Sequence, residues 1–189
     1  ALIQAHPVSP LQPNTVMMGW SDDPARCDSF VEILNSVKLL NKSLILVRDG
    51  GLHNVQGKRK IDVWWRGKEN GSLMMLLTYL LTLNQEWSDA SVRLLRVIQE
   101  EAGRKPATEA LEQLLEAARV GGEAEVIVSQ DGFAEVLHRY SRNASVVLLG
   151  FNVPEIGSSS EFQRRFDAML EGLPTTLLVC SSGEADVLA

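Results

Sequence analysis

The stretch Val146-Val147-Leu148-Leu149 is apolar at every position, and this feature decides the fold class. A strand with one face in water alternates apolar and polar side chains, whereas a strand buried on both faces does not. Leu177-Leu178-Val179 repeats the pattern later in the chain. Uninterrupted apolar strands of this kind are typical of a parallel sheet with helices on both faces.

Five further apolar runs extend the expected sheet. Together these runs predict about seven strands, over residues 14–20, 44–48, 61–65, 91–98, 125–129, 144–151 and 175–181. Between them lie about five segments with apolar residues at helical spacing. One of these, residues 73–84, is apolar nearly all round, so we expect a buried helix there. Because strands and helices alternate, the sequence predicts an α/β fold with a mostly parallel, open sheet.

Two segments do not fit this alternation. Residues 1–12 contain Pro7 and Pro10, and we interpret them as a linker from an upstream region, with the α/β domain over 13–189. Residues 49–60 are polar, bear glycines and are too broken for a helix, which predicts a mobile loop.

Composition excludes several classes of protein. The 189 residues carry a net charge of -6, which argues against a general nucleic-acid binder because phosphate neutralisation needs surplus Lys and Arg. No apolar run approaches the ~20 residues of a membrane span, so we do not expect this segment to cross a membrane. The start of the chain lacks the features of a signal peptide. The two cysteines are far apart and favour a reduced, intracellular setting.

Candidate catalytic and metal-binding groups do not assemble in the sequence. None of the three histidines has a metal-ligand neighbour at i+2 to i+4, so we expect surface roles for them and no metal site. Cys27 lies on an apolar helical stripe, and Cys180 ends a strand without a nearby base. Asp49 follows a strand, but Asp49-Gly50-Gly51 is more simply a turn. We therefore expect no catalytic residues and no enzyme activity.

One loop is a weak candidate for binding a nucleotide phosphate. Gly150, Gly157, Ser158 and Ser159 follow a predicted strand and open a helix, where free backbone N–H groups favour an anion. The chain contains neither G-x-G-x-x-G nor G-x-x-x-x-G-K-[ST]. A capping role for the serines is the simpler interpretation, and no cofactor is expected.

Two short motifs are candidates for an interface. Adjacent strand residues point to opposite faces, so Trp64 and Trp65 are expected to pack under helices on both sides of the sheet. The alternative is an edge position with one Trp exposed for docking. Lys58, Arg59 and Lys60 form a basic run in an acidic protein, either a solvated loop or a contact for anionic lipid or an acidic partner.

Several blocks resemble the cytosolic C-terminal domain of the cation–chloride cotransporters. The first is Pro13-Asn14-Thr15-Val16-Met17-Met18-Gly19-Trp20. The second is Ile61-Asp62-Val63-Trp64-Trp65, followed by a short turn with Gly71 and the apolar run 73–82. Supporting blocks are 145–149 and 172–179, so the resemblance spans about residues 13 to 182. Arg66 to Gly71 departs from the family's acidic turn, and no phosphoregulatory insert follows Ile98, which suggests a minimal member without kinase control.

The resemblance implies both a fold and a function. The fold would be similar to universal stress proteins, and 13–189 would be the second half of a larger cytosolic domain. The function would be regulation and dimerisation, at the cytoplasmic face of the cell membrane, of a cotransporter moving chloride with potassium, sodium or both. Its partners would be the transmembrane domain of the same transporter and a second copy. The alternative is a free-standing universal-stress-type protein that binds nucleotide at Gly150 and Gly157 to Ser159.

Overall fold

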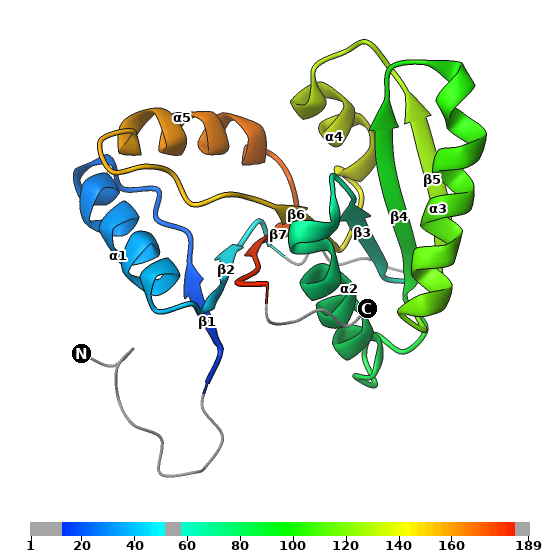
Figure 1. Ribbon diagram of the computed structural model, residues 1–189, viewed down its shortest axis with the longest axis horizontal. Helices are drawn as coiled ribbons and strands as arrows, with labels where there is room; N and C mark the ends of the chain where they lie inside the picture. The colour runs from blue at the N-terminus through cyan, green and yellow to red at the C-terminus, as the bar shows by residue number, and fades with distance from the viewer. Residues whose placement is uncertain (1–12, 52–57, 184–189) are drawn as a thin grey trace.

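The computed structural model describes residues 13–51 and 58–183, in which seven strands alternate with five α-helices (Figure 1). The strands are β1 (Thr15–Gly19), β2 (Ser43–Arg48), β3 (Lys60–Trp64), β4 (Ser91–Ile98), β5 (Glu123–Val128), β6 (Val146–Gly150) and β7 (Thr175–Cys180). The helices are α1 (Cys27–Leu39), α2 (Lys68–Thr82), α3 (Arg104–Ala117), α4 (Phe133–Ser141) and α5 (Ser159–Leu170). The expected linker, residues 1–12, and the middle of the loop expected over 49–60 lie outside the described residues.

All seven strands form one sheet in the order β1-β2-β7-β6-β3-β4-β5. Every neighbouring pair is parallel except β2 and β7, which run antiparallel with Ile45 opposite Val179. The β1–α1–β2 unit therefore joins the sheet in the reverse direction. The predicted fold class, a mostly parallel open sheet of about seven strands, is confirmed.

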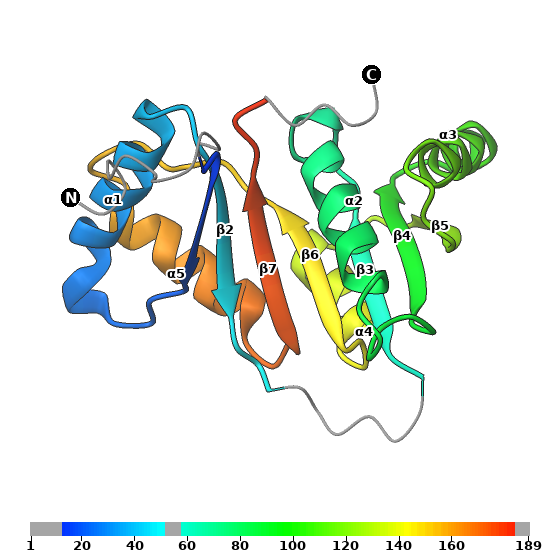
Figure 2. The same ribbon diagram turned by 90° about the horizontal axis from the view of Figure 1, so that it is seen from below.

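Helices cover both faces of the sheet, as predicted. In Figure 2, α2 lies in front of the sheet, and α4 and α5 lie behind it. At the two ends of the sheet, α1 shares a core with α4 and α5, and α3 shares one with α2. The two resulting cores are separate: Trp64 packs in the core beneath α1, α4 and α5, and Trp65 in the core beneath α2 and α3. Both indoles are buried, with 1% and 5% of their surface exposed, so the interpretation as packing residues holds and neither offers an exposed docking side chain.

The expectation of a fully buried helix over 73–84 is wrong in its second half. The first turns of α2 are buried at Leu73, Met74 and Met75, but Tyr79, Leu80 and Leu83 are 38%, 51% and 63% exposed. The reason is that α2 packs on the sheet along one side only, and none of the described elements covers its outer side near the end. The second half of α2 therefore has apolar side chains that the fold of this chain leaves exposed.

Gly71 lies inside α2 rather than in the turn before it, because the helix begins three residues earlier, at Lys68. The ring of Trp65 occupies the space that a side chain at position 71 would need: a Cβ placed there would lie 2.1 Å from the ring. Trp65 can thus fill its core because position 71, in the first turns of α2, is a glycine.

We predict that Gly71→Ala destabilises the domain by about 1–3 kcal/mol, because the added methyl group displaces a buried indole. This loss opposes the gain in helix propensity of about 1 kcal/mol that alanine brings. Gly121→Ala is the matched control, since nothing lies within 4 Å of a Cβ at that position. Urea unfolding of both variants gives the free energies, and equal stability of the two would contradict this packing role.

Candidate functional site

A cleft lies at the carboxyl ends of β3 and β6. The next strand after β3 is β4, which lies toward one edge of the sheet. The next strand after β6 is β7, which lies toward the other edge. This reversal leaves a crevice between the two strand ends, which is the usual ligand site of open α/β sheets. The crevice has a volume of about 950 Å³ and is bounded by the residues after β3, the start of α2, the start of α4 and the second half of α5.

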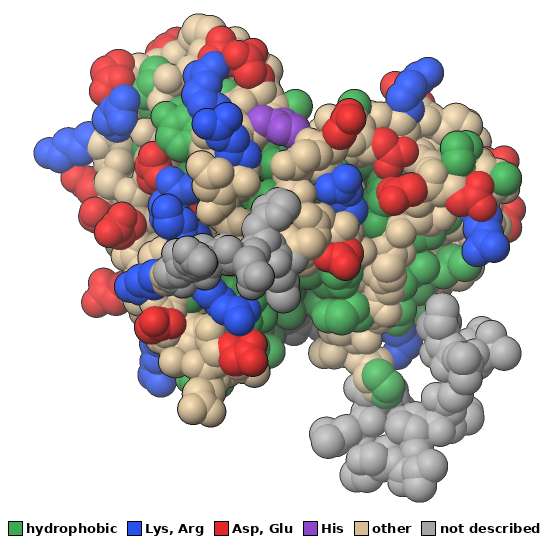
Figure 3. Space-filling view, turned by 180° about the vertical axis from the view of Figure 1, so that it is seen from behind, with side chains coloured by type: hydrophobic (Ala, Val, Ile, Leu, Met, Phe, Trp, Pro, Cys, Tyr) green, Lys and Arg blue, Asp and Glu red, His purple; other side chains and the backbone are tan. Residues whose placement is uncertain are grey.

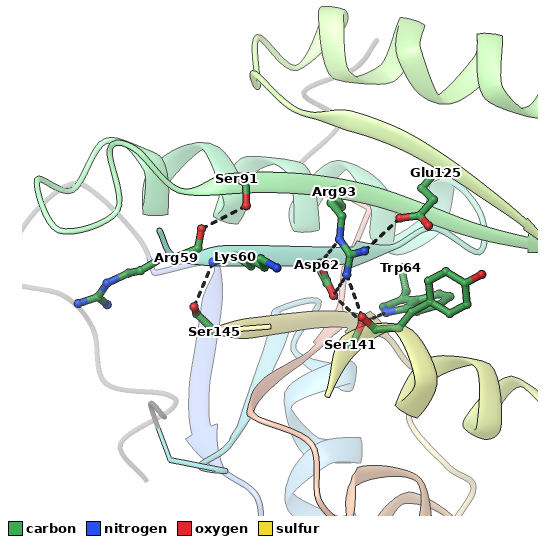
Figure 4. A network of polar contacts seen from close by, with 10 residues as sticks. Arg59, Lys60, Asp62, Trp64, Ser91, Arg93, Glu125, Ser141 and Ser145 are labelled. Atoms are coloured by element: carbon green, nitrogen blue, oxygen red, sulfur yellow. Dashed lines mark hydrogen bonds and ion pairs between the residues drawn. The ribbon is translucent and has the colours of Figure 1, made fainter. Parts of the chain in front are cut away.

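A buried ion pair holds β3 beside the cleft (Figure 4). Asp62 is 0% exposed, and Arg93 on β4 binds it through two hydrogen bonds, Nε to Oδ1 at 2.9 Å and Nη2 to Oδ2 at 2.8 Å. Arg93 also donates to Glu125 at 3.1 Å and to the carbonyl of Tyr140 at 2.9 Å. The hydrogen bond with Asp62 raises the pKa of the Arg93 guanidinium, so this side chain stays charged. A buried carboxylate without such partners would be strongly destabilising.

The same carboxylate fixes the indole of Trp64. Ser141 donates to Asp62 at 2.7 Å and accepts from Nε1 of Trp64 at 3.0 Å. Trp64 in turn meets Phe133 edge to face at 5.4 Å, and the guanidinium of Arg66 lies 4.8 Å from the centre of the Phe133 ring. A continuous chain of contacts thus runs from the buried ion pair to a cation at the cleft.

Asn70 ties the start of α2 to the ends of two strands. Its Nδ2 donates to the carbonyl of Phe151 at 3.0 Å, and its Oδ1 accepts from the backbone N–H of Ser181 at 2.8 Å. A Cβ at Gly150 would lie 3.1 Å from the Asn70 side chain. The close approach of Asn70 therefore accounts for Gly150 without a bound phosphate.

The predicted phosphate candidates do not come together. Gly150 lines the cleft, whereas Gly157, Ser158 and Ser159 do not. Ser158 is the N-cap residue of α5 but makes no side-chain capping bond, and its Oγ donates instead to the carbonyl of Glu155 at 2.7 Å. The prediction that a serine caps this helix is therefore right in position, but the Ser158 hydroxyl bonds to Glu155 and not to an N–H group of α5. Ser159 is buried.

The basic run lies at the opposite end of β3 from the cleft. Lys58 and Lys60 are exposed. Arg59 is engaged, because it pairs with Glu86 at 3.1 Å and lies 4.5 Å from the centre of the Trp87 ring. On the face seen in Figure 3, acidic and basic side chains are interspersed.

The remaining candidate groups have structural partners. Cys27 is buried and Cys180 partly so, and burial raises the pKa of both thiols, which favours the unreactive protonated form. The carboxylate of Asp49 accepts from the N–H of Gly51 at 2.9 Å, as expected of a turn. His138 is half-buried rather than on the surface, because its Nε2 lies 2.9 Å from the carbonyl of Met169. The other two histidines lie outside the described residues.

Two further findings concern metals and membranes. Among residues 13–51 and 58–183, no three His, Cys, Asp or Glu side chains gather in a way that could hold a metal ion. In the same ranges, no helix has the length and apolar character needed to cross a bilayer.

Comparison with known proteins connects the chain to a family of transporters. Residues 46–132 match the family model "Solute carrier family 12". The fold is similar to the crystal structure of the cytoplasmic domain of a prokaryotic cation chloride cotransporter, with a TM-score of 0.71. That match has 18% sequence identity and covers 96% of this chain and 69% of the other. The chain resembles the cytoplasmic domain of a cation–chloride cotransporter.

A universal stress protein from Archaeoglobus fulgidus DSM 4304 shares the fold of this cotransporter-like domain more distantly. Its TM-score is 0.52 at 12% identity, over 92% of this chain and 62% of the other. The predicted likeness to universal stress proteins is thereby confirmed for the fold. The matched segment 46–132 includes Ile61-Asp62-Val63-Trp64-Trp65, the block on which the sequence resemblance chiefly rests.

We predict that Arg93→Met lowers the free energy of unfolding by about 3–5 kcal/mol, because it leaves the buried Asp62 carboxylate without its cation. Arg26→Met is the control, since Arg26 is paired with Asp23 on the surface and its side chain is 78% exposed. We expect the control to change stability by no more than about 1 kcal/mol. Denaturant unfolding followed by tryptophan fluorescence measures both. A loss below about 1 kcal/mol in Arg93→Met would show that the pair does not stabilise the sheet.

Proposed function

We propose that this chain is a cytosolic regulatory domain of a membrane cotransporter that moves chloride together with potassium, sodium or both. The observation that carries the proposal is the match of residues 46–132 to solute carrier family 12. The similarity in fold to the cytoplasmic domain of a cation chloride cotransporter supports it. In this role the domain catalyses no reaction, and the transported ions bind in the membrane part of the protein.

The proposed arrangement places the domain at the cytoplasmic face of the cell membrane. Its partners are the transmembrane domain of the same transporter and a second copy of the chain. By the same resemblance, residues 13–189 form the second half of a larger cytosolic domain. The exposed Lys58 and Lys60 are the members of the basic run available to an anionic partner, because Arg59 already pairs with Glu86.

We expect an antibody against this domain to detect, in fractionated source cells, a band far larger than 20.8 kDa in the membrane pellet. A membrane transporter that carries the domain would have that size and location. Washing the pellet with carbonate separates integral proteins from adsorbed ones. A soluble band near 20.8 kDa would contradict the proposal and favour the alternative, a free-standing nucleotide-binding protein.

We propose that dimers form through the outer side of the α2 C-terminal end. Leu83 follows Leu80 by three residues and Tyr79 by four, so its side chain lies next to both of theirs. All three side chains remain exposed in the folded chain. Exposed apolar groups that gather in this way mark interaction sites.

Light scattering of the chain at about 100 µM should therefore give a mass near twice 20.8 kDa. We expect Leu80→Asp with Leu83→Asp to return the mass to that of one chain, because the charges oppose burial of this surface. Leu39→Asp is the control: Leu39 is 87% exposed and lies on α1. A single-chain mass for the unmodified protein, or equal effects of both changes, would contradict a dimer through α2.

A further inference from the structure

The floor of the cleft at the ends of β3 and β6 is apolar. It is formed by Trp64, Met74, Phe133, Leu149, Phe151, Phe166 and Met169. The volume of about 950 Å³ lies near the upper end of the range, about 300–1,000 Å³, that small-molecule sites occupy. A cleft of this size and lining suits an organic molecule with an apolar body and not a bare inorganic ion.

The edge of the cleft is cationic. Arg66, Lys68 and Arg165 line it and are exposed, and within the described residues none of the three forms an ion pair. Glu69 is the acidic residue among the lining side chains. This local excess of positive charge stands in a chain whose net charge is -6. An anionic group entering the cleft therefore meets a favourable field.

Aromatic rings hold the two guanidinium groups at the border between floor and solvent. Arg66 lies 4.8 Å from the ring centre of Phe133, and Arg165 lies 5.4 Å from that of Phe166. Neither guanidinium donates a hydrogen bond to a described residue, so their N–H groups remain available to a ligand. Guanidinium groups bind carboxylate and phosphate through two parallel hydrogen bonds.

We infer that this cleft binds a small amphipathic anion, a molecule with an apolar body and a carboxylate or phosphate head. The body lies along Phe133 and Met169, which are partly exposed in the lining, and the head meets Arg66, Lys68 and Arg165. The first turn of α2 adds to the same field, because Gly67 provides no side chain to cap its N–H groups. The inference concerns the isolated domain and does not depend on the proposed role in transport.

The test uses 8-anilinonaphthalene-1-sulfonate, a fluorescent amphipathic anion, titrated into the folded chain at low ionic strength. We expect saturable binding that weakens as salt is added. Arg66→Gln and Arg165→Gln should each weaken binding about tenfold, the usual worth of a charge-assisted hydrogen bond. Arg164→Gln is the matched control, because Arg164 neighbours Arg165, is exposed and does not line the cleft. Circular dichroism confirms that each variant is folded.

Competition then separates the head from the body of the ligand. Phenyl phosphate should displace the dye at much lower concentration than either inorganic phosphate or phenol, because only phenyl phosphate has both parts. The inference is overturned if the dye does not bind, or if Arg66→Gln and Arg165→Gln bind it as well as Arg164→Gln does. Equal competition by inorganic phosphate and phenyl phosphate would also overturn it, since the site would then recognise a simple ion.

Discussion

The parallel pairing of β3 with β6 is the constraint on which the rest of the structure depends. Ile61 lies opposite Val146 and Trp64 opposite Leu149, in the middle of the seven-stranded sheet. Both strands are buried on both faces, so helices must cover the sheet on each side. The chain leaves these two strands in opposite directions, and this divergence opens the cleft at their carboxyl ends.

The buried Asp62 carboxylate lies on one of these two strands and fixes the side chains around it. Without Arg93, the buried Asp62 carboxylate would destabilise the fold. The pair is stable because hydrogen bonds join the carboxylate to the guanidinium. The carboxylate also holds Ser141, and through it the indole of Trp64. Since Trp64 supports Phe133, and Phe133 supports Arg66, one buried ion pair positions a cation at the cleft.

The segment that matches the transporter family model contains only part of the cleft. The segment that matches solute carrier family 12, residues 46–132, supplies Arg66 and Lys68. Arg165 lies on α5, outside that segment. The cleft is therefore a product of the whole fold. The apolar end of α2, in contrast, lies within the matched segment and faces away from the chain's own cores.

The sequence alone determined the fold class, the strands and helices, and the placement of Trp64 and Trp65 on opposite faces. Each follows from periodicity within one element, which is a local property. Only the tertiary structure decided that Arg93 pairs with Asp62, that Asn70 packs closely against Gly150, and that Arg66, Lys68 and Arg165 share one cleft. These residues lie on different elements, and their proximity depends on strand order and register, which local periodicity does not encode. For the same reason the sequence could not show that Gly157, Ser158 and Ser159, the weak phosphate candidates, lie apart from the cleft that Gly150 lines. It also predicted burial for an end of α2 that no described element covers.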